Sequence, residues 1–294
     1  MTRPARTTGP SGWFAAPAVL LFGVFALVPL FGVAALSFTH WDGLGPVSWA
    51  GLDNWTSAAS DPDTRVAVWL TVKLTVVSVL FQAPVSLLLG VFLAGRQRYR
   101  AGLGALYFLP LLFSSTAVAL TFIALLDPNF GVGPALGVPA LAQNWLGDPR
   151  LAFYVVVFVI GWSFIPFHTV VYQAGARQIP IQIYEASRMD GAGAVSQFFR
   201  ITLPLLKHTI VTSTTLMTVG SLTYFDLIFV LTGGGPGNAT RVLPLDMYLT
   251  GFRSYEMGRA SVTALVLVVL GLLIALGLNR ITGVDRMESE MEGS

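Results

Sequence analysis

The chain has 294 residues, of which 54% are hydrophobic and 11% are charged. A soluble protein of this size needs more polar surface than this composition supplies, so the sequence favours an all-α, polytopic transmembrane helix bundle. Cysteine is absent and the three histidines are widely separated, which argues against disulfides and zinc sites. The net charge of +2 comes from Lys and Arg in short loops, which is first of all a membrane-topology signal.

Six apolar segments reach the length of about 20 residues that a helix needs to cross a hydrocarbon core of about 30 Å. They cover residues 13–38, 66–94, 103–126, 151–175, 208–231 and 258–280. The first follows Arg3 and Arg6, as in a signal peptide, but its apolar stretch is too long and no clear cleavage site follows Pro29. We expect an anchor helix there, and a transmembrane domain over residues 13–282 between tails at 1–12 and 283–294.

Lys73 is a charged residue within the second predicted span, so its energetic cost bears on whether that span can insert into the membrane. A lysine at the centre of a membrane helix costs about 2.5–3.5 kcal/mol, whereas each Leu, Val or Phe returns about 0.3–0.6 kcal/mol. Because many apolar neighbours surround Lys73 and it lies towards the outer end, we expect this span to insert.

Basic residues divide unequally between the two sides of a six-span arrangement. With a cytoplasmic N-terminus, eleven Lys and Arg fall inside and five fall outside. The inside residues are Arg3, Arg6, Arg96, Arg98, Arg100, Arg177, Arg188, Arg200, Lys207, Arg280 and Arg286, and the outside residues are Arg65, Arg150, Arg241, Arg253 and Arg259. This positive-inside bias predicts that both termini and the loop 176–207 are cytoplasmic.

A short polar segment interrupts the apolar chain between the fourth and fifth spans. Residues 184–191 read YEASRMDG, and ITLP follows after nine further residues. Pro180 can start a short helix, Gly191 can end it in a left-handed conformation, and residues 194–200 can form a second turn or two before Pro204. The pattern predicts a compact helix–turn–helix whose small side chains allow a partner to approach closely.

The spacing E-A-A-x3-G-x9-I-x-L-P resembles the EAA motif of permease subunits in binding-protein-dependent ABC importers. Only the third position differs, because Ser187 stands where alanine is usual. The resemblance implies that this loop enters a groove on a nucleotide-binding subunit and passes ATP-driven closure to the membrane helices. The residues expected to couple to that subunit are Glu185, Ala186, Ser187, Asp190 and Gly191. An amphipathic loop on the membrane surface is the alternative.

Three other segments extend the resemblance over most of residues 13–282. They are SFTHWDG at 37–43, GLDNW at 51–55 and FDLIFVLTGGGPGNAT at 225–240, and they are similar to the first permease of carbohydrate importers. The chain contains no counterpart of the large external domain of maltose-type permeases, so it is more similar to six-span sugar and glycerol-phosphate permeases. The resemblance implies a type I importer in a bacterial cell membrane, in which a second homologous permease, two ATPase subunits and an extracytoplasmic solute-binding protein take part in alternating access.

The chain itself has no visible means of binding ATP. It has no phosphate-binding loop of the form G-x-x-x-x-G-K-[ST], and it has no H-E-x-x-H or G-x-S-x-G motif. We therefore expect neither a cofactor nor an enzyme activity in this chain, with ATP hydrolysed by partner subunits. The glycines at 233–237 fall in an outside loop, which we expect to face the binding protein.

Substrate contacts are expected on the two spans that flank the coupling loop, which the resemblance also indicates. Aromatic faces and hydroxyl groups, which commonly hold sugars, recur there at helical spacing. The candidate pathway residues are Gly161, Phe164, His168, Thr218, Ser221, Tyr224, Phe225 and Asp226, together with Lys73. Helix packing is the alternative for each of them, and Lys73 and Asp226 can also extend to the membrane interface.

Basic residues within the spans bear on the nature of the cargo. A phosphorylated polyol such as glycerol 3-phosphate would need basic groups, and the spans offer only Lys73, with His168 as a helper. A neutral sugar is therefore favoured, and the phosphorylated polyol remains the alternative. A stand-alone secondary transporter would need several buried carboxylates for ion coupling, and within the predicted spans only Asp226 is a candidate.

Overall fold

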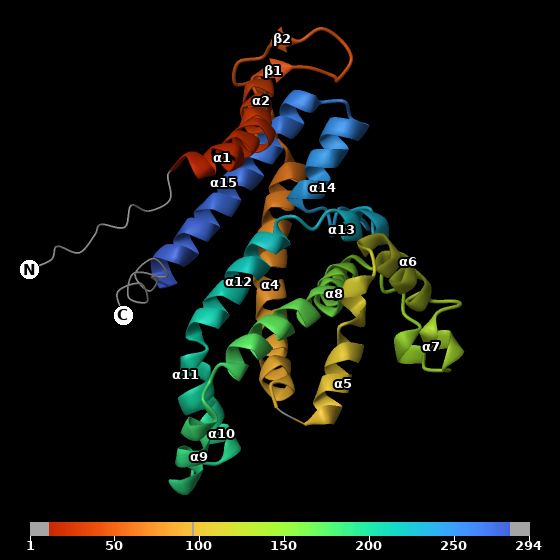
Figure 1. Ribbon diagram of the computed structural model, residues 1–294. Helices are drawn as coiled ribbons and strands as arrows, with labels where there is room; N and C mark the ends of the chain where they lie inside the picture. Colours follow the sequence, from red (N-terminus) through yellow and green to blue (C-terminus); the bar gives the residue numbers. More distant parts are fainter. Residues whose placement is uncertain (1–11, 96, 283–294) are drawn as a thin grey trace, which may run out of the picture. The chain divides into compact units, whose positions relative to one another are not determined.

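The computed structural model describes residues 12–95 and 97–282, and most of them lie in helices (Figure 1). The chain divides into two compact units. The N-terminal unit comprises the chain up to Ser60 and Met247–Leu265, and the main unit comprises Asp61–Asp246 and the chain from Val266. The predicted all-α class is confirmed, with one two-stranded hairpin among the described residues. Apart from Gly12, the predicted tails lie outside the described residues.

The N-terminal unit starts with an apolar helix over Trp13–Leu36, close to the predicted first span. Its α-helical parts are α1 (Ala16–Phe22) and α2 (Val28–Leu36), which a π-helical stretch joins. An antiparallel pair of strands, β1 (Thr39–His40) and β2 (Ser48–Trp49), comes next, and α3 (Asp53–Ser60) completes this part.

Asn54 fastens the hairpin of the N-terminal unit to its helices. The buried Asn54 amide donates hydrogen bonds to the carbonyls of Ser37 (3.0 Å) and Thr39 (2.8 Å). Gly258, at the beginning of α15 (Met257–Thr282), lies so close to the Thr39 carbonyl that any side chain there would clash. Glycine at this position therefore lets α15 start directly beside the hairpin.

The main unit is built around α4 (Pro62–Leu93) and α8 (Pro149–Arg177), with α12 (Lys207–Ser221) against both (Figure 1). Both long helices begin after an aspartate, because Asp61 and Asp148 each accept a backbone N–H bond two residues on and proline suits the first turn. The other α-helices are α5 (Arg98–Tyr107), α6 (Ser115–Leu125), α7 (Val132–Ala135), α9 (Ile181–Met189), α10 (Ala194–Gln197), α11 (Leu203–Leu205), α13 (Asp226–Leu231) and α14 (Leu243–Tyr248). Short 3-10 helices cover Leu109–Leu112 and Pro139–Leu141, and a π-helical turn covers Phe198–Thr202, while a second π-helical turn, Leu249–Arg253, belongs to the N-terminal unit.

Glycines allow α4 and α8 to approach closely. A Cβ on Gly90 of α4 would lie 2.6 Å from the Tyr172 Cβ and 2.8 Å from the Thr169 carbonyl oxygen of α8. A Cβ on Gly161 of α8 would lie 2.5 Å from the Phe81 ring of α4. Lipid removes the hydrophobic drive for helix association, so this contact depends on such close packing.

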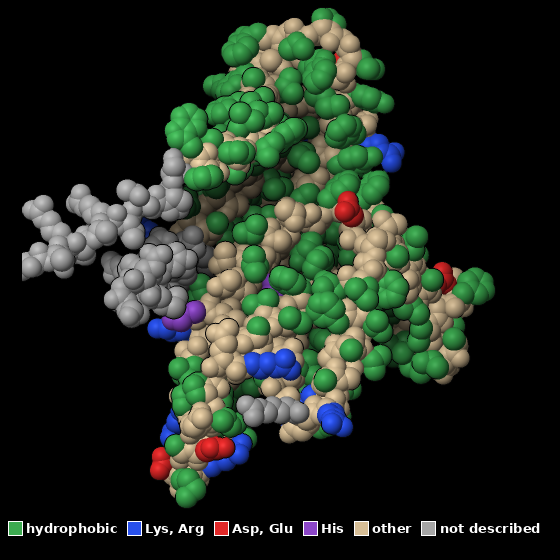
Figure 2. Space-filling model, viewed as in Figure 1, with side chains coloured by type: hydrophobic (Ala, Val, Ile, Leu, Met, Phe, Trp, Pro, Cys, Tyr) green, Lys and Arg blue, Asp and Glu red, His purple; other side chains and the backbone are tan. Residues whose placement is uncertain are grey.

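Within residues 12–95 and 97–282, four single helices are long and apolar enough to cross a membrane, namely Trp13–Leu36, Pro62–Leu93, Pro149–Arg177 and Met257–Gly277. Two further pieces, Arg98–Leu112 and Ser115–Leu125, qualify only as a pair and are bent by 98°. Large apolar side chains cover much of the visible surface (Figure 2), as contact with lipid requires. The structure thus supports a membrane bundle but does not reproduce six simple spans.

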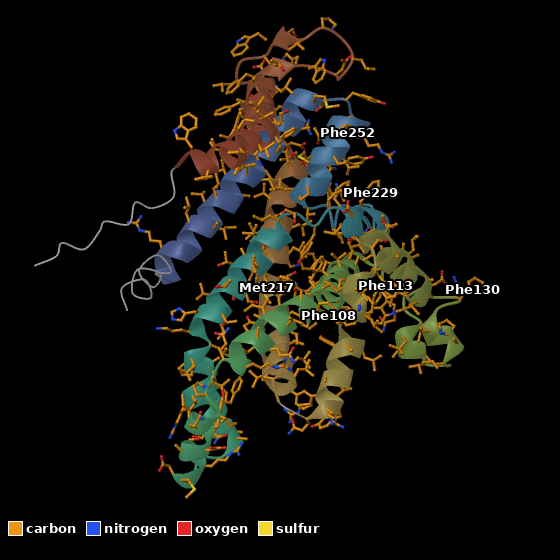
Figure 3. The ribbon with its side chains drawn as sticks, viewed as in Figure 1. Phe108, Phe113, Phe130, Met217, Phe229 and Phe252 are labelled. Carbon is orange, nitrogen blue, oxygen red and sulfur yellow. The ribbon has the colours of Figure 1, made fainter. Side chains whose placement is uncertain are left out.

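The predicted span 103–126 breaks at Phe113, which Figure 3 labels. Phe113 is extended, with φ −90° and ψ 146°, and Pro110 lies in the short 3-10 helix just before it. The Ser114 hydroxyl then caps α6 by accepting a hydrogen bond from the Ala117 N–H. Apolar composition continues through this bend, so hydropathy alone merged the two pieces.

The predicted span 208–231 is divided as well. The α12 helix has 15 residues, which at 1.5 Å each gives about 22 Å, less than the hydrocarbon core. The backbone N–H groups of Leu222 and Thr223 bond three residues back, which tightens and ends the helix at Ser221. The chain becomes helical again at Asp226, in α13.

Arg241 joins the loop after α13 to the start of α4. Its guanidinium contacts Asp63 (2.9 Å) and the fully buried Asp246 (2.7 Å). The Asn238 amide donates to Asp63 at 3.0 Å, and the Thr64 hydroxyl donates to Asp246 at 3.3 Å. Burial raises the pKa of the Asp246 carboxyl, and Arg241 opposes this effect by stabilising the charged form.

We expect Arg241→Gln to lower the free energy of unfolding by about 3–5 kcal/mol, because it leaves a buried carboxylate without its counter-charge. Thermal unfolding of the purified complex in detergent measures the loss. Asp246→Asn added to Arg241→Gln should restore part of the stability. Arg253→Gln, at an exposed arginine, is the matched control. An unchanged melting temperature for Arg241→Gln would contradict this role.

Candidate functional site

The predicted helix–turn–helix forms one end of the main unit (Figure 1). Pro180 directly precedes α9, and Gly191 ends the turn in the left-handed region with φ +80°. A second helical run then extends from Ala194 through α10 and α11 to Leu205. The predicted helix start, glycine stop and second helix are all present, and the second helix is longer than predicted.

Hydrogen bonds tie the two arms of this segment together. The Gln197 amide donates to the Ser187 hydroxyl (2.7 Å) and to the Tyr184 carbonyl (3.1 Å). The Tyr184 and Thr202 hydroxyls are 2.9 Å apart. Ser187, the one departure from the motif, is therefore a bonding partner across the turn and holds the segment as a single body.

The face presented to solvent carries the other motif residues. Glu185 and Ala186 are exposed on α9, and the Glu185 carboxylate has no ion-pair or hydrogen-bond partner within the described parts of the chain. Met189 is 89% exposed beside them. Asp190 and Gly191 line a hollow of about 390 Å³ with Ser187 and Arg200, together with Ala192, Gly193, Ser196 and Ile201. This face therefore combines a carboxylate that has no partner among the described residues with small and apolar groups.

A cavity of about 420 Å³ lies between α8, α12, α13 and the bent pair of helices. Five of the predicted pathway residues line it, namely Phe164, His168, Tyr224, Phe225 and Asp226. The Phe164 and Tyr224 rings lie 5.1 Å apart at an interplanar angle of 33°. Asp226 is exposed in the first turn of α13, and no hydrogen bond or ion pair engages its carboxylate among the described residues. Aromatic faces and a free acceptor thus meet in one place.

His168 lines this cavity from α8, and two neighbouring side chains hold its ring. The ring Nδ1 lies 3.0 Å from the Ser213 hydroxyl of α12, and the Phe167 ring packs edge-on against the imidazole at 5.1 Å. The ring orientation is therefore fixed before any ligand arrives.

The other predicted pathway residues make contacts within their own helix or with a neighbouring helix. Gly161 lies against Phe81, as described above. The Thr218 hydroxyl donates to the Thr214 carbonyl within α12 at 2.7 Å. Two more residues contact neighbouring helices, since the Ser221 hydroxyl is 2.6 Å from that of Thr75 on α4 and the Lys73 ammonium lies 4.1 Å above the Phe153 ring of α8.

Several lining residues were not predicted from the sequence. They are Leu111, Ser115, Phe167, Leu216, Gly220, Thr223 and Leu227. Phe167 is one helical turn from Phe164, so its spacing could have identified it. Leu111 and Ser115 reach the cavity only because the chain bends at Phe113, which hydropathy did not reveal.

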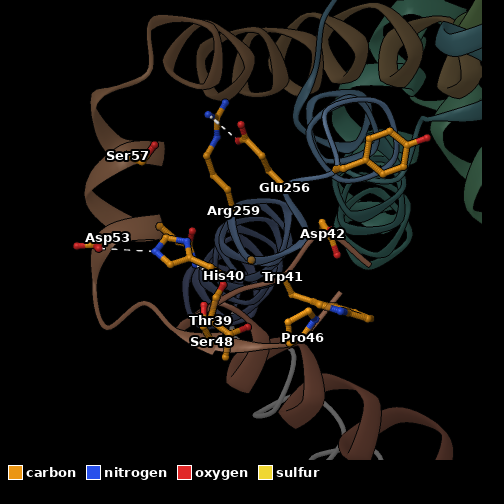
Figure 4. A pocket seen from close by; sticks show the side chains of 13 residues that line it. Thr39, His40, Trp41, Asp42, Pro46, Ser48, Asp53, Ser57, Glu256 and Arg259 are labelled. Atoms are coloured by element: carbon orange, nitrogen blue, oxygen red, sulfur yellow. Dashed lines mark hydrogen bonds and ion pairs between the residues drawn. The ribbon is translucent and has the colours of Figure 1, made fainter. Parts of the chain in front are cut away.

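The N-terminal unit holds a second, polar cavity of about 560 Å³ (Figure 4). It is formed by the two sequence segments 37–43 and 51–55 with the start of α15. The His40 ring lies 3.8 Å from the Asp53 carboxylate, and Arg259 pairs with Glu256 at 3.0 Å. Backbone N–H groups of Gly45 and Leu44 lower the pKa of the Asp42 carboxyl. Throughout residues 12–95 and 97–282, no group of three His, Asp or Glu side chains could hold a metal ion.

Comparison with known proteins identifies the family. Residues 86–282 match the family described as the binding-protein-dependent transport system inner membrane component. The chain belongs to this family. It is therefore an ABC permease subunit of the inner membrane, as the motif at Glu185 predicted.

Individual relatives agree with this assignment. The permease is 33% identical to the probable ABC transporter permease protein YurN of Bacillus subtilis, over 90% of this chain and 92% of that one. It is 31% identical to the multiple sugar-binding transport system permease protein MsmF of Streptococcus mutans, over 90% and 93%. The crystal structure of a bacterial ABC transporter that is involved in the import of the acidic polysaccharide alginate contains a chain of the same fold. The TM-score is 0.81 and the identity 24%, over 92% of this chain and 93% of that one.

Gln197→Ala should loosen the helix–turn–helix between Ile181 and Leu205, because it removes both hydrogen bonds to α9. Two hydrogen bonds of about 1 kcal/mol each predict at least about tenfold faster amide hydrogen exchange in residues 184–191. Hydrogen–deuterium exchange of the complex measures this, with Gln178→Ala, at an exposed glutamine, as the control. Equal protection in both variants would show that other contacts hold the two arms.

Proposed function

We propose that this permease moves a neutral carbohydrate into the bacterial cytoplasm by ATP-driven alternating access. The observation that carries the proposal is the rigid helix–turn–helix with an unpaired Glu185 on its exposed face. Such a carboxylate is suited to a complementary groove on a nucleotide-binding subunit, whose closure on ATP would displace the segment as a body. This chain supplies the pathway, and two ATPase subunits supply the hydrolysis.

The aromatic cavity supports a neutral cargo. The Phe164 and Tyr224 rings can stack against a sugar ring, and the Asp226 carboxylate can accept its hydroxyl hydrogens. The cavity lining contains no Lys or Arg, and Lys73, the basic group that a phosphate would need, lies over Phe153 instead. A phosphorylated polyol would meet a carboxylate there without a counter-charge, so glycerol 3-phosphate is the less favoured alternative. The name of MsmF, which mentions multiple sugars, points to the same class of cargo.

The positive-inside bias supports a cytoplasmic position for α9 and both termini. The polar cavity of the N-terminal unit and the glycine-rich loop at 233–237 then lie outside, where an extracytoplasmic solute-binding protein delivers its ligand. A second, homologous permease completes the translocation pathway. Alternating access follows if the helix–turn–helix moves α8 and α12, because these two helices form part of the cavity wall.

Uptake by the complete complex in proteoliposomes tests the coupling role. Labelled mono- and oligosaccharides and glycerol 3-phosphate are offered with the binding protein and ATP. Glu185→Lys should reduce uptake at least about tenfold, because a reversed charge cannot be accommodated in a desolvated interface. The subunits should still assemble.

Gln143→Lys, in an exposed loop of the main unit, is the control for an added lysine and should transport normally. Uptake that persists without the ATPase subunits would instead identify a secondary transporter. Uptake that depends on the ATPase but is insensitive to Glu185→Lys would remove the coupling role from this residue.

Asp226→Asn should weaken transport without affecting assembly. A hydrogen bond to a charged group contributes about 1.5–3 kcal/mol, so we expect the apparent KM for the sugar to rise about 10- to 100-fold. Asp127→Asn removes the same charge away from the cavity and should leave KM unchanged. An unaltered KM in Asp226→Asn would exclude this carboxylate from the pathway.

A further inference from the structure

A second cavity of the main unit, of about 490 Å³, lies on the other side of α8. The second half of α8, the helix α5, the 3-10 helix Leu109–Leu112 and the end of α4 enclose it. Its lining residues are Leu93, Arg100, Ala101, Gly104, Ala105, Tyr107, Phe108, Leu112, Pro166, Thr169, Val170, Gln173 and Arg177. Only two of these side chains are charged, and both are arginines. This cavity shares no residue with the aromatic one.

The lining residues change from basic to apolar in the same direction along α8 and along α5. Along α8 the lining begins at Arg177 and passes Gln173 to Val170, and along α5 it begins at Arg100 and ends beyond the helix at Leu112. Because the C-terminal end of α8 and the N-terminal end of α5 lie on the same side, both arginines mark one end of the cavity. Figure 2 likewise shows Lys and Arg side chains gathered towards this end of the main unit. The positive-inside bias makes this end cytoplasmic.

The basic end has unused hydrogen-bond donors. Arg177 has no hydrogen-bond or ion-pair partner in the described parts of the chain. The Arg100 guanidinium donates to the Phe92 carbonyl (2.5 Å) and to the Tyr99 hydroxyl (3.2 Å), and it lies 4.4 Å above the Phe92 ring. These contacts fix Arg100 in place and leave three of its five N–H donors available.

Thr169 lies deeper in the wall of the cavity. Its side chain is only 1% exposed, and its hydroxyl has no hydrogen-bond partner among the described residues. The hydroxyl oxygen has almost no accessible surface, so it lies behind the lining and not on it.

We propose that this cavity binds an anionic phospholipid of the inner leaflet. The phosphate of the headgroup lies between Arg100 and Arg177. The small residues Ala101, Gly104 and Ala105 leave room for the first part of an acyl chain, which continues over Leu112, a side chain 72% exposed towards the surroundings. A soluble anion would use the arginines but not the apolar wall. The inference rests on the membrane location and orientation of the permease and not on its cargo.

Lipid binding by the purified complete complex tests the proposal. Native mass spectrometry is used to titrate phosphatidylglycerol and phosphatidylcholine with identical acyl chains. We expect phosphatidylglycerol to bind on the order of tenfold more tightly at one site, and Arg100→Gln with Arg177→Gln to abolish this preference. Arg98→Gln with Arg150→Gln removes the same charge from exposed positions outside the cavity and should preserve it.

A steric variant distinguishes the cavity from a general charge effect. A Cβ on Gly104 meets only the end of Leu93, at 3.9 Å, so Gly104→Leu can fill the cavity while both arginines remain. It should weaken phosphatidylglycerol binding about as much as the double arginine variant, with assembly checked by gel filtration. Equal loss in both arginine pairs, an intact preference in Gly104→Leu, or displacement of the lipid by millimolar inorganic phosphate would overturn the proposal.

Discussion

The close contact between α4 and α8 is the constraint on which the main unit depends. A bilayer offers no hydrophobic reason for two apolar helices to associate, so their surfaces must fit at short range. Gly90 and Gly161 provide this fit by admitting Tyr172 and Phe81 of the facing helix. Once α8 is fixed in this way, one side of it faces α12 and the other faces α5. The aromatic cavity and the cavity beside α5 therefore use α8 as a common wall.

Hydroxyl groups inside the spans illustrate why the candidate site could be predicted only in part. Ser221 and Thr218 lie at the same helical spacing as Phe225, and the sequence treats them alike. In the structure, the Ser221 hydroxyl reaches Thr75 of α4, whereas Phe225 lines the cavity. Packing and binding call for the same residue types in lipid. The two residues separate because α12 ends at Ser221, so Phe225 lies beyond that helix and the helical spacing no longer applies to it.

Local backbone signals were more informative than composition. Pro180 and Gly191 correctly placed the ends of α9, because each residue restricts the backbone in its own way. By contrast, the bend at Phe113 was missed, since an extended phenylalanine in an apolar stretch leaves hydropathy unchanged. That one omission also hid Leu111 and Ser115 from the predicted cavity. The helices themselves were thus well predicted, and their breaks were not.

The hydrogen bonds of Gln197 have a mechanical consequence. Because hydrogen bonds to Ser187 and Tyr184 join the two arms, the segment should move as one body. A displacement of α9 would then also displace Leu205. The next residue, Leu206, leaves the helical conformation, with φ −86° and ψ 2°, before α12 begins. Under the proposed function, Leu206 is the point at which the segment would turn against α12, directly beside the helix that it moves.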